Sequence, residues 1–204
     1  MKTMKPALIA AIMTIMTAAN ANAAVIVNFS QVGADVVVTG SGTFDTSGLT
    51  KLSPNIPGSA YSRKLEGGAG ILTLGDQSAN GDVYNRLSGP SSFGKAGFSA
   101  LPTLTIGQTI GLNSSNFFLP GNYKSGSEIL GAQVYAGQSL ASLGLTDGTS
   151  FVYRSSSDSL TINIGQTVTA AVPEPATWGM MILGMGAIGF IMRRRNVTTR
   201  VKFA

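Results

Sequence analysis

Short apolar runs recur along the chain from residue 24 onwards, separated by stretches rich in Gly, Ser, Thr and Asn. The first covers residues 25–30, where Val25, Val27 and Phe29 lie two positions apart. This spacing places three apolar side chains on one face of a β-strand. The turn sequence Gly33-Ala34-Asp35 follows, and Val36-Val37-Val38-Thr39 starts a second strand. The pattern therefore predicts an N-terminal β-hairpin.

Further short apolar runs are separated by turn residues, as in Asn80-Gly81-Asp82 and Asp147-Gly148. Residues 51–63 contain prolines and show no period, which predicts a loop, and Ser139–Leu143 predicts little more than one helical turn. Many short strands with regular turns favour an all-β fold, either an antiparallel β-sandwich or a partly closed barrel. The further strands are expected at Ile71–Leu74, Thr103–Ile106, Thr109–Leu112, Asn116–Leu119, Ala132–Tyr135, Ser150–Tyr153 and Leu160–Ile164.

The first 23 residues show a different pattern. Lys2 and Lys5 precede an uncharged, largely apolar stretch over residues 7–19, and Ala21 and Ala23 follow it with one residue between them. A positive start, an apolar middle and small residues at the cleavage positions make up a secretory signal peptide. We expect cleavage after Ala23. An uncleaved anchor helix is the alternative, but the apolar stretch is short for a hydrocarbon core of about 30 Å.

A second apolar segment lies near the C-terminus. Residues 178–192 carry no charge, begin with Trp178 and are followed at once by Arg193, Arg194 and Arg195. An aromatic residue at the headgroup layer and a basic stop-transfer cluster are typical of a transmembrane helix with its basic end in the cytoplasm. A buried core helix has the same length, but it needs no arginine cluster at its end. One C-terminal transmembrane helix is therefore expected.

The net charge does not indicate a further function class. The net charge is +5, from 14 basic and 9 acidic residues. Half of the basic residues lie in the two terminal segments, and residues 24–172 carry seven basic against eight acidic side chains. Because nucleic-acid binding needs positive charge gathered on a folded face, we expect no nucleic-acid partner.

The chain contains no histidine and no cysteine. The two absences exclude zinc sites built on those residues and nucleophile systems that use them, and they exclude disulfides. No catalytic residue, metal site or cofactor is assigned.

The C-terminal residues carry a resemblance to a known family. Pro173-Glu174-Pro175, then Trp178, a glycine-rich apolar span and the arginines at 193–195 resemble the PEP-CTERM sorting signal of Gram-negative bacteria, in its PEPxxW subclass. The resemblance implies recognition by an exosortase, a membrane-embedded cysteine protease that cuts near the tripeptide. It also implies an association with exopolysaccharide and biofilm.

Two weaker candidates lie within residues 24–172. Asp76 and Asp82 flank an oxygen-rich stretch, which is compatible with a calcium ligand set, with a glycosidase carboxylate pair or with ordinary turn chemistry. Five tyrosines are compatible with a sugar-stacking surface, but packing at the edge of a core explains them better. They are Tyr61, Tyr84, Tyr123, Tyr135 and Tyr153.

The sequence thus predicts a signal peptide at 1–23, an exported β-rich domain at 24–172, a sorting signal at 173–195 and a cytoplasmic tail at 196–204. The domain is expected to face the periplasm from the inner membrane and then to be released to the surface or matrix. A non-enzymatic structural role is the favoured hypothesis. A carbohydrate-binding or adhesive module comes second, and a carboxylate-dependent glycosidase third.

Overall fold

The computed structural model describes residues 24–57, 64–76, 78–113 and 116–165. The expected signal peptide, sorting signal and C-terminal helix lie outside this part of the chain. The described part forms strands and two short 3₁₀ turns, at Thr46–Gly48 and Gly67–Ala69. The strands are β1 (Val25–Val32), β2 (Asp35–Thr43), β3 (Lys51–Ile56), β4 (Leu72–Leu74), β5 (Gly81–Asn85), β6 (Leu104–Gly107), β7 (Ile110–Leu112), β8 (Asn116–Pro120), β9 (Glu128–Tyr135), β10 (Thr149–Arg154) and β11 (Ser159–Ile164).

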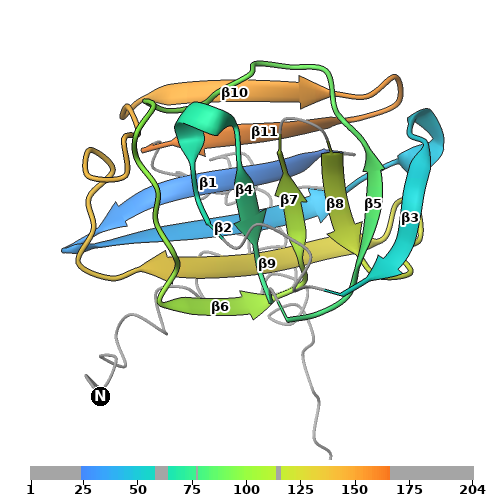
Figure 1. The fold of residues 1–204 in the computed structure, drawn as a ribbon, viewed down its shortest axis with the longest axis horizontal. Coiled ribbons are helices and arrows are strands. Elements are labelled where there is room, and N and C mark those ends of the chain that lie inside the picture. The colour runs from blue at the N-terminus through green and yellow to red at the C-terminus, as the bar shows by residue number, and fades with distance from the viewer. Residues whose placement is uncertain (1–23, 58–63, 77, 114–115, 166–204) are drawn as a thin grey trace, which may run out of the picture. The chain divides into compact units, whose positions relative to one another are not determined.

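These strands form two sheets, which confirms the expected all-β sandwich. One sheet has the strand order β10-β11-β1-β2-β9-β6, and the other has the order β3-β5-β8-β7-β4. In Figure 1 the second sheet lies in front of the first, and its strands run across the strands behind them. Such crossed packing is one of the two ways in which sheets stack around a core.

All strand pairs among the described residues are antiparallel except one. Strand β1 pairs with β2 through the expected hairpin, and on its other side it pairs in parallel with β11, from Val25 opposite Leu160 to Phe29 opposite Ile164. The first and last strands of the described domain are thus neighbours in the middle of the six-stranded sheet (Figure 1). A side-chain hydrogen bond of 3.0 Å from Asn163 Nδ2 to Asn28 Oδ1 also links the two strands.

The alternation of the N-terminal hairpin has the expected consequence. Val25, Val27 and Phe29 are fully buried and belong to the main core, while the residues between them are half-buried. Aromatic rings complete this core: Phe44, directly after β2, packs on Phe117 of β8 with ring centroids 4.8 Å apart. Sandwich cores of this kind form because inward side chains of the two sheets interdigitate.

Two sequence predictions about the second sheet were wrong. Lys51–Ile56 was expected in a loop but forms the edge strand β3, whose register against β5 shifts twice. Pro54 is tolerated there because an edge strand needs hydrogen bonds on one side only. Asp82 was expected in a turn, but the turn lies just before it, and β5 begins at Gly81.

The expected helical turn at Ser139–Leu143 is a hydrogen-bonded turn rather than a helix. The Leu143 N–H donates a 3.1 Å hydrogen bond to the Ser139 carbonyl, four residues back, as in an α-helix. The next N–H, of Gly144, donates at 3.0 Å to the Ala141 carbonyl, only three residues back. Gly144 then ends the turn with φ +71°. A nucleus of this length is not stable as a helix, so the segment remains a turn held by its neighbours.

The chain passes between the sheets at a junction where backbones approach closely. Gly75 follows β4, and Gln108 connects β6 of one sheet to β7 of the other. A Cβ atom at Gly75 would lie 1.9 Å from the Gln108 carbonyl oxygen, and the Gly75 φ is +83°. Only glycine fits both the conformation and the contact.

Candidate functional site

The two candidate aspartates have separate structural roles. The Asp82 side chain on β5 is fully buried and accepts hydrogen bonds from Lys51 Nζ at 2.7 Å, from the Asn55 N–H at 2.8 Å and from the Tyr123 N–H at 3.2 Å. Burial alone would raise the pKa of Asp82, but the hydrogen bonds from Lys51 and Asn55 outweigh it and leave the pKa below the ordinary value. The ionised Asp82 carboxylate therefore holds β3 and the β8–β9 loop against β5.

Asp76 instead closes its own turn. Its carboxylate accepts from the Ser78 hydroxyl at 2.6 Å and from the Ser78 N–H at 2.9 Å, and these bonds lower its pKa. A glycosidase acid needs a raised pKa and access to substrate, and neither aspartate has both. Among the described residues, no three of the Asp, Glu, His and Cys side chains come close enough together to hold a metal ion.

The four tyrosines in the described part of the chain pack in the core rather than form a sugar-stacking surface. Tyr84, Tyr123, Tyr135 and Tyr153 are all buried, with exposed fractions of 1–9 %. Tyr123 also donates a hydrogen bond of 2.6 Å to the Ser127 carbonyl, and Tyr135 accepts one of 2.7 Å from Gln133. Tyr61 lies outside the described residues. The packing interpretation made from the sequence is confirmed for these four.

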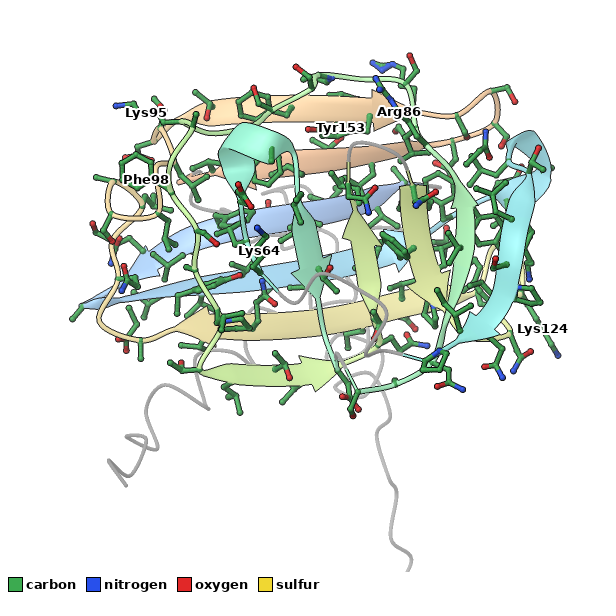
Figure 2. The ribbon with its side chains drawn as sticks, viewed as in Figure 1. Lys64, Arg86, Lys95, Phe98, Lys124 and Tyr153 are labelled. Carbon is green, nitrogen blue, oxygen red and sulfur yellow. The ribbon has the colours of Figure 1, made fainter. Side chains whose placement is uncertain are left out.

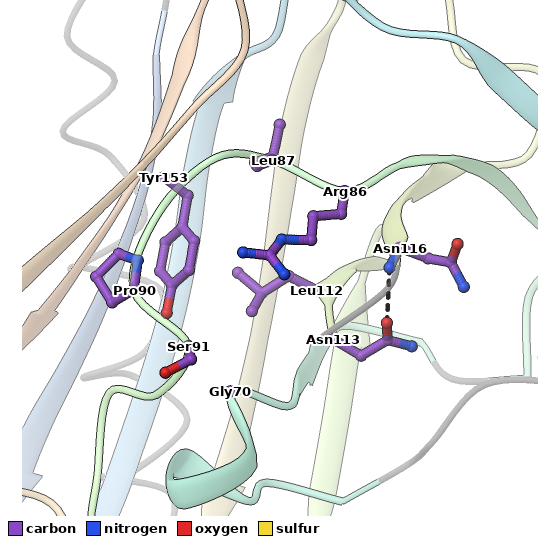
Figure 3. A pocket seen from close by; sticks show the side chains of 9 residues that line it. All are labelled: Gly70, Arg86, Leu87, Pro90, Ser91, Leu112, Asn113, Asn116 and Tyr153. Atoms are coloured by element: carbon purple, nitrogen blue, oxygen red, sulfur yellow. Dashed lines mark hydrogen bonds between the residues drawn. The ribbon is translucent and has the colours of Figure 1, made fainter.

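One of these tyrosines differs from the others. The Tyr153 hydroxyl on β10 is the buried side-chain polar atom that has no hydrogen-bond partner in the described part of the chain. It lines a small pocket together with Arg86, which follows β5 (Figure 2). The pocket residues are Gly70, Arg86, Leu87, Pro90, Ser91, Leu112, Asn113, Asn116 and Tyr153 (Figure 3). Sequence patterns do not predict this pocket, because its residues come from separate segments of the chain.

A family model described as the PEP-CTERM protein-sorting motif matches residues 171–195. The chain carries a PEP-CTERM protein-sorting motif. This match includes the Pro173-Glu174-Pro175 tripeptide, Trp178 and the arginines at 193–195 that the sequence singled out. The motif is a C-terminal sorting signal of an exported protein, and it implies processing by an exosortase with this chain as substrate.

No curated protein and no solved structure matches the chain. Within the described residues, no helix is both long and apolar enough to cross a membrane. The helix expected over residues 178–192 lies outside them. The PEP-CTERM motif therefore carries the functional assignment.

Proposed function

We propose that this chain is a non-enzymatic protein of the cell surface or extracellular matrix that an exosortase releases from the inner membrane. In this proposal residues 1–23 are removed after Ala23 as a signal peptide, and residues 178–192 hold the domain in the membrane with its bulk in the periplasm. The arginines at 193–195 stop transfer, and residues 196–204 form the cytoplasmic tail. The motif is of the PEPxxW subclass, with Trp178 in the headgroup layer.

The position of the sorting motif carries this proposal. The last strand that the structure describes, β11, ends at Ile164, and the family match begins at residue 171. A cut near Pro173 would therefore leave the eleven described strands of the sandwich together. Prolines on both sides of Glu174 disfavour helix and keep the tripeptide extended, which suits binding in a protease cleft.

The same proposal gives the released domain a structural role, in contact with exopolysaccharide. The chain has no histidine or cysteine for nucleophilic chemistry. The buried carboxylate of Asp82 accepts hydrogen bonds from Lys51 and from two backbone N–H groups, so it is not available for catalysis. These observations favour a scaffold over an enzyme.

Replacing Glu174 by alanine is expected to block release. The wild type from its native host should end near Pro173, whereas Glu174→Ala should keep the apolar segment and stay with the membrane, because the recognised carboxylate is gone. Intact-mass measurement of the C-terminus checks this. Glu128→Ala is the matched control, because Glu128 is an exposed glutamate on β9 outside the motif. Retention of residues 178–192 in both the wild type and Glu174→Ala would mean a permanent anchor and would refute release.

A further inference from the structure

The pocket beside Tyr153 is built from segments far apart in the sequence. Ser88 and Arg154 form an isolated β-bridge, with N–H to carbonyl distances of 2.8 and 2.7 Å. This bridge fixes the segment after β5 against β10. A Cβ atom at Gly89 would lie 2.6 Å from the Tyr153 ring, so the backbone there packs directly on the ring. The position of Arg86 next to Tyr153 is therefore fixed by backbone contacts.

The pocket joins an apolar wall to a polar opening. Leu87 and Leu112 are 5 % and 4 % exposed and form the wall, while Arg86 and Ser91 are exposed at the opening. Figure 3 shows the Tyr153 hydroxyl and the Arg86 guanidinium pointing into the same space, with Asn113 and Asn116 at its other side. The Asn116 N–H donates a 2.7 Å hydrogen bond to Asn113 Oδ1, which closes that side.

The Tyr153 hydroxyl needs a partner in this space. The Tyr153 side chain is 4 % exposed, and its hydroxyl has no hydrogen-bond partner among the described residues. A buried polar group without a partner is unfavourable, so native proteins rarely keep one without a reason. Burial raises the pKa of Tyr153 to about 12, and Arg86 acts in the opposite direction. The hydroxyl is therefore protonated at neutral pH and can donate.

The charge and size of the pocket indicate the chemistry of its ligand. Arg86 is the charged residue among the nine that line the pocket, and none of them is acidic. The pocket volume is about 40 Å³, which leaves room for a group of a few atoms. A carboxylate offers two oxygens in one plane, so one can accept from a guanidinium while the other accepts from a hydroxyl. The rest of such a ligand would lie outside, over Pro90 and Ser91.

We propose that this pocket binds the carboxylate group of a small organic anion, with Tyr153 and Arg86 as the two donors. The carboxylate can belong to a free acid or to an acidic sugar, and both present the same group to the pocket. The proposal is independent of the sorting signal.

The test uses acetate, glucuronate, glucose and inorganic phosphate as probes of the full-length chain in detergent micelles, followed by amide NMR. Acetate and glucuronate should give saturable shifts at Ser91, Asn116 and Tyr153, and glucose none. Tighter binding of glucuronate than of acetate would identify an acidic sugar as the source, and equal binding a free acid. Absence of saturable shifts with both carboxylates, equal shifts with glucose, or tighter binding of phosphate would overturn the proposal.

Variants separate binding from stability. Tyr153→Phe and Arg86→Gln should each weaken acetate binding by at least about fivefold, the effect of one lost hydrogen bond. Arg154→Gln is the matched control and should bind as the wild type does, because adjacent residues of a strand point to opposite faces. Without ligand, Tyr153→Phe should melt no lower than the wild type, since the hydroxyl it removes has no protein partner. A lower melting temperature together with unchanged acetate binding would assign the space to a structural water and refute the carboxylate site.

Discussion

Replacing Gly75 by alanine is expected to lower the free energy of unfolding by about 3–5 kcal/mol. The new Cβ would lie 1.9 Å from the Gln108 carbonyl oxygen, at a φ of +83°. Neither group can move easily, because Gln108 joins β6 of one sheet to β7 of the other. Relief of the contact would therefore shift the two sheets against each other. Urea unfolding followed by circular dichroism measures the loss.

Gly126→Ala separates backbone strain from this close contact. Gly126 has a similar φ of +78°, but a Cβ atom there would meet nothing within 4 Å. Its replacement should lower stability by only about 1–2 kcal/mol. Equal losses for the two variants would mean that conformational strain alone matters and that the junction can relax.

Replacing Asp82 by alanine should have the second largest effect, a loss of about 2–4 kcal/mol. The change leaves the Asn55 and Tyr123 N–H groups without their acceptor and removes the ion pair with Lys51. Edge strand β3 would then be held mainly by its irregular pairing with β5. Thermal unfolding measures the overall loss, and hydrogen exchange of β3 amides shows where it occurs.

Asp76→Ala is the control for this experiment. Asp76 is partly exposed, and its carboxylate accepts hydrogen bonds from Ser78 in its own turn. Its replacement should lower stability by less than about 1 kcal/mol. A loss at Asp76 as large as that at Asp82 would contradict the distinct roles assigned to the two carboxylates.

The hydrogen bonds to Asp82 also make the free energy of unfolding depend on pH in the acid range. The pKa of Asp82 in the folded protein is below the ordinary value of 3.8. A group of this kind stabilises the fold above its unfolded pKa, and the contribution is lost as the pH falls through the folded pKa. The wild type should therefore lose stability between about pH 5 and pH 2, and Asp82→Asn should lose less over that range. Parallel curves for the two proteins would exclude Asp82 as a source of the acid dependence.

Local patterns were enough to predict most of the strands but not their partners. The alternation at Val25, Val27 and Phe29 predicted β1 because one period places all three side chains in the core. Strand β3 was missed because Pro54 argues against a strand in general, and only its edge position makes it acceptable. The parallel neighbour of β1 could not be predicted, since it begins at Ser159 and no local signal joins the two strands.

The candidate pocket shows the same limit more clearly. The tyrosines were predicted to pack in the core, and four of them do. Among the buried side chains of the described residues, the Tyr153 hydroxyl is the one without a hydrogen-bond partner. The Ser88–Arg154 bridge brings Arg86 and Ser91 to it from another part of the chain, and no local pattern predicts that contact. By contrast, the sorting motif is read from contiguous residues, so the sequence alone was sufficient to find it.

The parallel pairing of β1 with β11 also affects when the domain can fold. Asn28 and Asn163 are bonded across 135 residues, so the centre of the larger sheet stays incomplete until the last strand arrives. Contacts between such distant residues form slowly, and unpaired strand edges remain exposed meanwhile. During synthesis and export, β1 and β2 therefore emerge long before the strand that completes their sheet. The chain must remain unfolded, or be protected by a chaperone, until almost the whole domain has crossed the membrane.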